Sequence, residues 1–400
     1  MVISLESGSM RILFCNYEYP PLGGGGGVAT SLLAEELAQR HQVTVLTSHG
    51  RGLARQETIN GVRIVRVPVG RRYRPTAGLP SMFGYMLMGS RVGRQLIAAD
   101  HYDVINTHFA LPSGPVGDSL SRWSGIPNVL TVHGGDLYDP SKWLSPHRQP
   151  LLRPWVRSML ARADAVIAQS RDTLANATRF YLPTLEAEII PLGIKRPPVV
   201  TVSRQTYGFR DDDVLLITVG RLVARKAMDQ LIPLIDEPGF EQAHLLVVGD
   251  GPLQPELRQR AMQLGLSHRV HLFGHVEEIE KFQLLHMADA FVSTSQHEGF
   301  GLVFLEAMAC GLAIVCYDRG GQNDFLEAGV TGDVVRLNDL AAFASACHRL
   351  VMDRTAREQA GAENRRRVER YLIDRCAERY ETTLRRVAAA QRRASRPCTP

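Results

Sequence analysis

Short apolar runs alternate with amphipathic stretches along the whole chain. Helical spacing is clearest at residues 28–40, where Val28, Leu32, Leu33 and Leu37 fall on one face. Alternation of this kind predicts a parallel sheet with helices on both faces. In the first half, the runs that predict strands cover residues 11–17, 42–47, 61–69, 103–108, 128–133, 165–170 and 187–192.

The same alternation starts again after a short break. Residues 195–202 contain two adjacent prolines and no helical period, which is typical of an interdomain linker. Further strands are predicted at residues 213–220, 243–250, 269–273, 289–294 and 312–318, followed by helical spacing from 339 to 393. The pattern therefore predicts two doubly wound α/β domains. Such sheets bind ligands beyond the carboxyl ends of their strands, so we expect functional residues just after strands, around a cleft between the domains.

The composition agrees with this architecture and excludes several classes of protein. With 400 residues, 44% of them hydrophobic and 7% aromatic, the chain is long enough for two cores and is neither disordered nor fibrous. It contains no run of 18 apolar residues, and residues 1–9 lack the basic start and apolar centre of a signal peptide, so we expect a cytoplasmic protein. The six cysteines are scattered without a CxxC pair, which favours reduced thiols over a zinc site or a disulfide framework.

Positive charge gathers in the first half of the chain. Residues 1–200 carry 21 Lys and Arg against 14 Asp and Glu, whereas residues 201–400 carry 25 against 27. A basic first half suits an anionic acceptor or peripheral contact with the inner face of a membrane, and a solvated basic face explains it equally well. The arginines near the C-terminus have no interleaved aromatic residues, so we expect no nucleic-acid partner.

A run of five glycines, Gly23–Gly27, follows the first predicted strand and opens the first helix. Glycine lets the backbone approach an anion closely, and a helix N-terminus offers unpaired amides, so a phosphate group is the expected ligand. A surface turn without a ligand is the alternative. A dinucleotide-binding fingerprint fits poorly, because Val28 stands in place of its third glycine and no acidic residue ends the second strand.

Two later motifs each follow a predicted strand of the second domain. The segment GRLVARK at 220–226 places Arg221 and Lys226 on one loop, where two cations suit a diphosphate. The segment HEGFGLVFLE at 297–306 places Glu298 on a glycine-rich turn and Glu306 inside the following helix. Glu306 stands in an apolar run, where an unpaired carboxylate is costly, so we favour a ligand-binding role over a solvent-facing one.

These motifs, with VVGDGP at 247–252 and TVHG at 131–134, resemble those of the family 4 retaining glycosyltransferases with the GT-B fold. The resemblance implies two Rossmann-like domains: an acceptor-binding domain at 1–195 and a nucleotide-sugar-binding domain at 203–369. A final helix at 370–395 would pack back on the first domain. The implied reaction moves a sugar from a nucleotide-diphosphate sugar to an acceptor hydroxyl with retention of configuration, in the synthesis of a surface polysaccharide or glycolipid.

The resemblance also assigns roles to individual residues. Arg221 and Lys226 match the cations that hold the diphosphate, Glu298 matches the carboxylate that holds the donor sugar, and His133 matches a histidine near the reacting face of that sugar. Ala227 departs from the pattern, because similar proteins carry glycine after the lysine. The remaining donor-binding positions implied are Gly24, Gly25, Gly251, His275, Val276, Phe300, Gly301, Leu302 and Glu306, with the ribose diol on Glu306.

The acceptor and the residues that bind it are predicted from charge and from position after strands. The basic first half favours a sugar acceptor that is phosphorylated or lipid-linked. We expect neither a cofactor nor a metal, because the candidate metal motif Asp211–Asp213 precedes its strand and is more typical of a turn. Five residues on loops after strands are candidates for the acceptor site, each with a structural role as its alternative: Tyr17, Glu18, His108, Asp136 and Arg171.

Four other functions remain open. A GT-B phosphorylase or a sugar-nucleotide epimerase would use the same hold on the diphosphate without an alcohol as acceptor. A protein that binds a sugar nucleotide without catalysis would also fit the fold, although the intact set of charged residues argues against it. A dehydrogenase fits least, since the dinucleotide fingerprint is incomplete.

Overall fold

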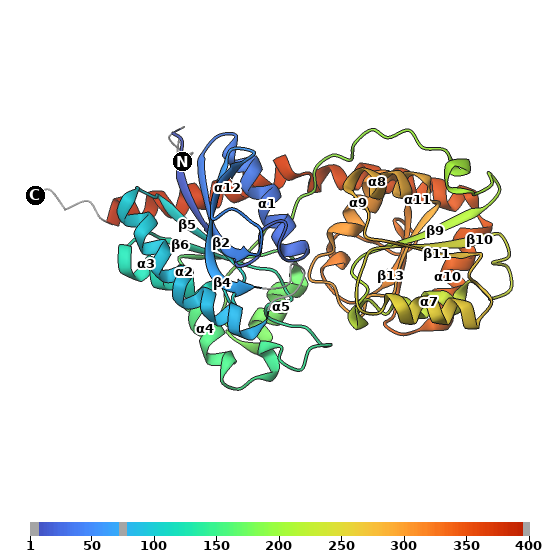
Figure 1. Cartoon of the computed structure of the whole chain (residues 1–400), viewed down its shortest axis with the longest axis horizontal. Helices are drawn as coiled ribbons and strands as arrows, with labels where there is room; N and C mark the ends of the chain where they lie inside the picture. The colour runs from blue at the N-terminus through green and yellow to red at the C-terminus, as the bar shows by residue number, and fades with distance from the viewer. Residues whose placement is uncertain (1–7, 72–77, 395–400) are drawn as a thin grey trace, which may run out of the picture. The chain divides into compact units, whose positions relative to one another are not determined.

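The computed structural model describes residues 8–71 and 78–394 (Figure 1). The chain divides into two compact units. One is formed by the chain up to Ile194 together with the part from Leu372 onward, and the other is Lys195–Tyr371. Each unit contains a single, mostly parallel sheet with helices on its faces, which confirms the predicted α/β class and its two Rossmann-like domains.

The first unit contains an eight-stranded sheet in the order β3-β4-β2-β1-β5-β6-β7-β8. Neighbouring strands are parallel except β3, which runs antiparallel to β4. The strands are β1 (Arg11–Cys15), β2 (Gln42–Gly50), β3 (Gln56–Ile59), β4 (Val62–Arg71), β5 (Val104–His108), β6 (Asn128–Val132), β7 (Ala165–Ala168) and β8 (Glu188–Ile189). The helices are α1 (Gly25–Ala38), α2 (Leu79–Ala99), α3 (Gly114–Ser124), α4 (Leu152–Arg162), α5 (Arg171–Phe180) and α12 (Ile373–Ala394).

Alternate residues of these strands face two different helical layers. On β1, for example, Ile12 and Phe14 pack in a cluster with α1 and α12, whereas Leu13 and Cys15 pack in a cluster with α2 and α3. The neighbouring cluster, on β6 and β7, includes Val156 of α4. Because successive side chains of a strand point to opposite faces, α2, α3 and α4 form one layer over one face of the sheet. The other layer consists of α1 and α12.

The last helix belongs to the first unit although it follows the whole second unit in sequence. Its apolar residues recur at helical spacing and join the core of β1, with Tyr380 1% exposed and Leu384 fully buried. At its start, the amide of Ile373 donates to the carbonyl of Ile194 at 2.8 Å. A Cβ on Gly193 would lie 2.6 Å from Cα of Ile373, so the chain passes close to α12 where it leaves the unit.

The second unit contains a six-stranded parallel sheet in the order β11-β10-β9-β12-β13-β14. Its strands are β9 (Val214–Val219), β10 (Ala243–Val248), β11 (Val270–Gly274), β12 (Ala290–Ser293), β13 (Ala313–Tyr317) and β14 (Gly332–Val335). Its helices are α6 (Leu231–Leu234), α7 (Gln254–Gln263), α8 (Glu278–Met287), α9 (Leu302–Cys310), α10 (Leu340–Met352) and α11 (Arg354–Val368).

The order of strands reverses once in each sheet. In the first unit β1 has β2 on one side and β5 on the other, and in the second β9 lies between β10 and β12. The loops after such neighbouring strands diverge and leave room for a ligand at the carboxyl edge of the sheet. Among the described helices, none is both long enough and apolar enough to cross a bilayer. The five cysteines within the described ranges are buried and unpaired, and Cys398 lies outside these ranges.

Candidate functional site

The second unit concentrates buried charge at the carboxyl ends of β9 and β12. Glu298, on the loop after β12, is 6% exposed and forms an ion pair with Nζ of Lys226. Its other carboxylate oxygen lies 3.4 Å from Nη1 of Arg225, which also donates to the carbonyl of His297. The structure thus brings together two residues that the sequence singled out and adds Arg225 to them.

The two cations determine the charge of this carboxylate. Burial alone raises the pKa of Glu298, but the charges of Lys226 and Arg225, with the hydrogen bond from Lys226, outweigh burial and lower the pKa from 4.5 to about 2. Burial lowers the pKa of Lys226, and the facing carboxylate opposes that shift. Glu298 is therefore an anion at neutral pH, which accepts hydrogen bonds from hydroxyl groups and has no proton to donate.

Hydrogen bonds tie the loop that carries both cations to the loop after β12. The hydroxyl of Thr294 shares its one proton between the carbonyl of Ala227 at 2.8 Å and that of Lys226 at 3.2 Å. The amide of Gln296 donates to the carbonyl of Arg225 at 2.8 Å. The backbone is therefore fixed at the point where the two cations leave it, which limits how far they can move from Glu298.

Ala227 has an unusual backbone conformation for an alanine. It joins two short 3-10 helices, η3 (Ala224–Lys226) and η4 (Met228–Gln230), with φ at +44° in the left-handed region. A Cβ is disfavoured there by ~1 to 2 kcal/mol, whereas glycine is not. The position where this sequence departs from the family pattern is thus one whose conformation favours glycine.

The loops after β9 and β10 pack backbone against backbone. A Cβ on Gly249 would lie 1.9 Å from the carbonyl oxygen of Gly220, and one on Gly251 would lie 2.4 Å from that of Leu222. Side chains at these glycines would force the loops apart. Gly251 therefore has a packing role, and its predicted contact with a nucleotide base stays a prediction.

Helix α9 begins with amides that have no acceptor. Within the described residues, nothing accepts a hydrogen bond from the backbone N–H groups of Phe300, Gly301 or Leu302. The ring of Phe300 is buried against Phe325, with centroids 5.3 Å apart, so the backbone is the part of this residue that can bind a ligand. Unpaired amides and the positive end of the helix dipole favour an anion at this position.

Glu306 has a partner that the sequence did not reveal. Its carboxylate lies 2.7 Å from Nζ of Lys281 on α8. Burial raises the pKa of Glu306, and the charge and hydrogen bond of Lys281 oppose that shift. The ion pair explains how an apolar helix tolerates a carboxylate. No motif could have indicated Lys281, because the two residues lie on different helices and meet only through packing.

The other predicted donor residues lie nearer the surface. Arg221 is exposed, and its charge contributes to the lowered pKa of Lys226. His275 is exposed and Val276 half-buried, both on the loop between β11 and α8. Gln254, at the start of α7, is the side chain nearest to Gly274 at the end of β11.

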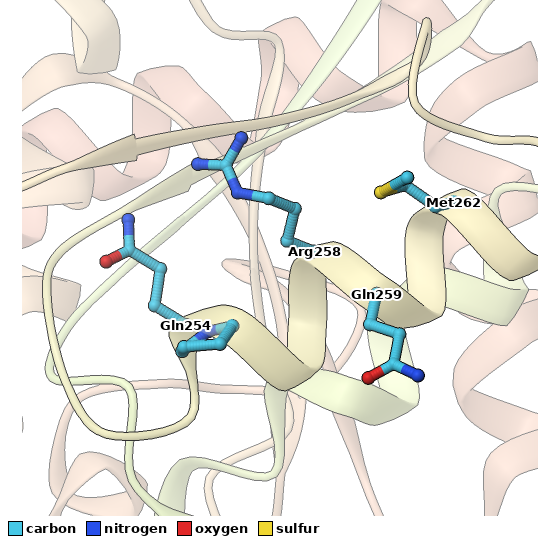
Figure 2. Close-up of a pocket in the computed structure, with 5 residues that line it drawn as sticks. Gln254, Arg258, Gln259 and Met262 are labelled. Carbon is cyan, nitrogen blue, oxygen red and sulfur yellow. The ribbon is translucent and has the colours of Figure 1, made fainter.

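Helix α7 also has a hollow of about 330 Å³ on its surface. Its lining comes from this single helix, and Figure 2 shows the labelled side chains spreading from the ribbon in different directions. None of the predicted site residues lines it. The lining residues are Gln254, Pro255, Arg258, Gln259 and Met262.

In the first unit, the carboxyl ends of β5 and β6 hold two buried histidines. Nε2 of His133 lies 2.9 Å from Nδ1 of His108, and the ring of Phe109 stacks on His133 with centroids 4.2 Å apart. Burial lowers the pKa of His133 from 6.5 to about 3, although the neighbouring Gln169, whose amide donates to the carbonyl of His133, opposes the shift. Burial and the neighbouring His133 also lower the pKa of His108. Both rings are therefore neutral at physiological pH.

The hydrogen bonds around His108 determine where each ring carries its proton. Asn16 donates to Oγ1 of Thr30 at 2.7 Å, and Thr30 donates its one proton to the carbonyl of Gly26 at 2.9 Å. Thr30 can then only accept from Nδ1 of His108, which lies 3.2 Å away. Nδ1 of His108 is thus protonated, and its one proton is shared between two acceptors, Oγ1 of Thr30 and the nearer Nε2 of His133. A neutral His133 keeps its proton on Nδ1, which has no partner among the described residues.

Asp136 holds the loop after β6. One carboxylate oxygen accepts from the amide of His133 at 3.0 Å, and the other accepts from the amide of Ala110 at 2.6 Å. Burial raises the pKa of Asp136 from 3.8 to about 6, although the backbone hydrogen bonds oppose the shift. Asp136 and His108, both candidates for the acceptor site, thus position His133, and their contact with an acceptor stays a prediction.

The glycine run opens α1, as its position in the sequence predicted. The carboxylate of Glu18 accepts from the amide of Gly24 at 3.0 Å, so one anionic group already lies at the start of this helix. A Cβ on Gly26 would lie 2.2 Å from the ring of Phe109, whereas one on Gly25 would meet nothing within 4 Å. Of the two predicted phosphate contacts, Gly25 is exposed and Gly24 is half-buried, so Gly25 has the more accessible backbone.

The remaining candidates for the acceptor differ in exposure. Tyr17 is 1% exposed, and its hydroxyl lies 2.8 Å from that of Ser81, so it packs inside the unit. Arg171 is exposed at the start of α5. Within residues 8–71 and 78–394, no three His, Cys, Asp or Glu side chains come together as a metal site. Asp213 accepts from the amide of Arg210 at 2.8 Å and so caps a turn, as predicted.

Comparison with known proteins gives a consistent result for both units. Residues 24–193 match the family described as glycosyl transferase 4-like domain, and residues 200–367 match glycosyl transferases group 1. The chain is 30% identical to a D-inositol 3-phosphate glycosyltransferase of Geodermatophilus obscurus, over 74% of this chain and 69% of the relative.

Solved structures share the fold along nearly the whole chain. The sucrose-phosphate synthase of Thermosynechococcus elongatus has a TM-score of 0.84 and 24% identity, over 96% of this chain and 100% of that structure. HepE of Anabaena, solved in complex with UDP-glucose, has a TM-score of 0.73 and 20% identity, over 94% and 99% of the two chains.

The left-handed conformation of Ala227 gives a prediction about stability. The variant Ala227→Gly should leave the free energy of unfolding unchanged or raise it by up to ~1 kcal/mol, because relief of the backbone offsets the greater freedom of glycine in the unfolded chain. Ala224→Gly, in the same loop but without a positive φ, should lower it by ~1 kcal/mol. Urea unfolding of both variants provides the measurement, and an equal loss in the two would show that position 227 is not strained.

The hydrogen bonds of His133 give a prediction about its protonation. In ¹⁵N NMR spectra, His133 should carry its proton on Nδ1 and stay neutral down to pH 5, because its pKa lies near 3. The exposed His101, recorded in the same spectra, serves as the reference ring. Thr30→Val removes the acceptor that selects the tautomer and should populate the other one. A His133 that titrates near pH 6.5 would contradict the arrangement.

Proposed function

The chain belongs to family 4 of the glycosyltransferases and has the GT-B fold, and on this basis we propose that it transfers a sugar from a nucleotide-diphosphate sugar to an acceptor hydroxyl with retention of configuration. The observation that carries this proposal is the ionised Glu298 between Lys226 and Arg225. It lies on the segment that leads to α9, whose first amides have no acceptor. This arrangement combines a site for hydroxyl groups with one for an anion.

Stabilisation of the leaving group follows from these charges. When the bond between the anomeric carbon and the diphosphate breaks, negative charge grows on the phosphate oxygens. Arg221, Lys226 and the amides of Phe300, Gly301 and Leu302 would bind that charge more tightly in the transition state than in the ground state. We propose that these groups do so without a metal or a cofactor.

The donor sugar and nucleotide would use the remaining groups of the second unit. Glu298 would accept hydrogen bonds from sugar hydroxyls, and Glu306 from the ribose diol, with the charge of Lys281 opposing protonation of Glu306. Gly251, His275 and Val276 would lie along the base. HepE, which shares the fold, was solved with UDP-glucose, which makes uridine the first base to test.

The first unit would bind the acceptor. We propose that Gly24 and Gly25 contact a phosphate group and that His133 contacts the donor sugar near its reacting carbon. The acceptor is proposed to be phosphorylated or lipid-linked, since the first half of the chain is basic and one relative is named for inositol 3-phosphate. Tyr17, Glu18, His108, Asp136 and Arg171 remain the candidate acceptor residues.

Retention is proposed to occur by substitution on one face of the sugar. The bond from the anomeric carbon to the diphosphate oxygen breaks, and the bond to the acceptor oxygen forms on the same face. The proton of the acceptor hydroxyl passes to the departing phosphate. A covalent intermediate would instead require a carboxylate on the opposite face of the anomeric carbon.

A first experiment identifies the donor and separates the alternatives. A thermal-shift screen of UDP, GDP, ADP and their sugars should single out one base, because a bound ligand stabilises the folded state by mass action. The selected sugar nucleotide is then incubated with inositol phosphate or a sugar phosphate as acceptor. Consumption of the sugar nucleotide that requires the acceptor supports transfer. Epimerised donor would instead indicate an epimerase, and consumption that depends on inorganic phosphate would indicate a phosphorylase. Binding without turnover would assign a non-catalytic protein.

Variants of the charged cluster test the assignment of residues. Lys226→Ala and Glu298→Gln should each lower kcat/KM by ~10²-fold or more, because both groups act on the reacting part of the donor. The control Arg260→Ala removes an exposed cation of α7 in the same unit and should leave kcat/KM unchanged. Full turnover by Lys226→Ala would refute the proposed role of this cluster.

A further inference from the structure

The surface of the first unit has a segment with five cations and no acidic residue. It lies between Asp139 and Asp164 and contains Lys142, four arginines and two tryptophans. All four arginines, Arg148, Arg153, Arg157 and Arg162, are exposed. Charge of a single sign over such a length indicates an anionic partner.

Large apolar side chains stand among these cations and point to solvent. Trp143 is 74% exposed, Leu151 90% and Trp155 36%, and Leu144 lies beside Trp143 at 48%. On α4 the opposite side is buried, with Val156 fully enclosed. One side of the helix therefore packs in the core, and the other presents tryptophan and arginine to solvent. This pattern suits the interface between water and lipid.

The segment is held in a defined shape. The side chain of Gln149 donates to the carbonyl of Trp143 at 2.9 Å, and the guanidinium of Arg153 donates to that of His147 at 2.6 Å. His147 is itself buried against the rings of Tyr138 and Phe180. The loop that carries Trp143 is thus anchored to the start of α4, which makes its exposed tryptophan a feature of the folded structure.

Within residues 8–71 and 78–394, most cations of this segment have no carboxylate partner, so their charge can attract an anionic surface. Among the described residues, Arg148 and Arg153 donate to carbonyl groups rather than carboxylates, and Arg157 makes no ion pair. Lys142 lies 3.1 Å from Asp139, and Arg162 pairs with Asp118, so these two contribute less. Carbonyl groups leave the positive charge of a guanidinium uncompensated.

A second stripe of the same kind lies on α2, in the same helical layer. Leu79, Phe83 and Leu87 recur every four residues and are 60% exposed or more, and Arg91 and Arg94 follow them in exposed positions. The helices α2, α3 and α4 cover one face of the sheet (Figure 1). The exposed side chains of both stripes therefore lie on the outer side of this layer. Two apolar stripes with cations on one side of a unit can meet a flat surface together.

We propose that this layer of the first unit docks on the surface of an anionic phospholipid bilayer, with Trp143, Leu151 and Trp155 inserted at the level of the headgroups and Arg148, Arg153 and Arg157 on lipid phosphates. The proposal goes beyond sugar transfer and does not depend on it. Negative headgroups complement the cations, and the apolar side chains lose contact with water on insertion. An acidic protein or a second copy of this chain would be the alternative occupants.

Flotation with vesicles tests the docking surface. The full-length protein should float with vesicles of phosphatidylcholine and phosphatidylglycerol and much less with phosphatidylcholine alone. Binding should fall about tenfold when salt is raised to about 0.5 M, because exposed charges are then screened. The triple variant Trp143→Ser, Leu151→Ser, Trp155→Ser should bind the anionic vesicles about tenfold more weakly.

A matched control tests whether binding to vesicles depends on this surface or on exposed apolar side chains anywhere in the protein. The triple variant Val199→Ser, Met262→Ser, Met352→Ser removes three exposed apolar side chains of the second unit and should float like the unchanged protein. Arg157→Gln tests the charge alone and should weaken binding less than the triple variant of the surface. Circular dichroism and gel filtration check that each variant is folded and report its oligomeric state.

Three results would overturn the proposal. The first is an unchanged protein that does not float with anionic vesicles. The second is a triple surface variant that binds them as well as the unchanged protein does. The third is a protein that does not float but forms a dimer which the surface variant breaks, and this result would assign the surface to a second copy of the chain.

Discussion

The structure depends most on the ion pair between Lys226 and Glu298. A carboxylate that is 6% exposed stays ionised here because two cations reach it from the neighbouring strand loop, and removing one member of such a pair costs ~3 to 5 kcal/mol. The pair forms because β9 and β12 are neighbours in the sheet although they are distant in sequence. The order of the strands thus creates the site, and the glycines of the surrounding loops allow the backbones to approach closely enough.

The two units differ in how they use buried polar groups. The second unit keeps charges at its carboxyl edge, where they can compensate the charge of a diphosphate and hold sugar hydroxyls. The first unit keeps two neutral histidines at the carboxyl ends of its strands, with His133 and His108 sharing one hydrogen-bond chain. This chain leaves the protonated Nδ1 of His133 without a partner, so that nitrogen is the natural donor to a ligand. The contrast fits a strongly anionic sugar donor and a reaction that needs an uncharged N–H group in a fixed position.

The sequence allowed the fold and the positions of the charged motifs to be predicted, because both follow from patterns along the chain. All twelve predicted strands are present, whereas β3 and β14 were missed, since their four residues each give no clear apolar period. Helix α1 begins three residues before the predicted start, within the glycines. Partners on other elements could not be predicted: Lys281 meets Glu306, and Thr30 orients His108, only after the helices have packed. The exposed Trp143 and Leu151 were also missed, because hydrophobicity alone does not tell which residues remain at the surface.

The central claim is that the charged cluster after β9 and β12 binds the activated sugar. A crystal structure with the preferred nucleotide sugar bound tests it most directly. The account predicts the diphosphate within hydrogen-bond distance of Lys226, Arg221 and the first amides of α9, and sugar hydroxyls on Glu298. A nucleotide bound elsewhere, for example over the hollow on α7, with the pair of Lys226 and Glu298 untouched, would contradict it.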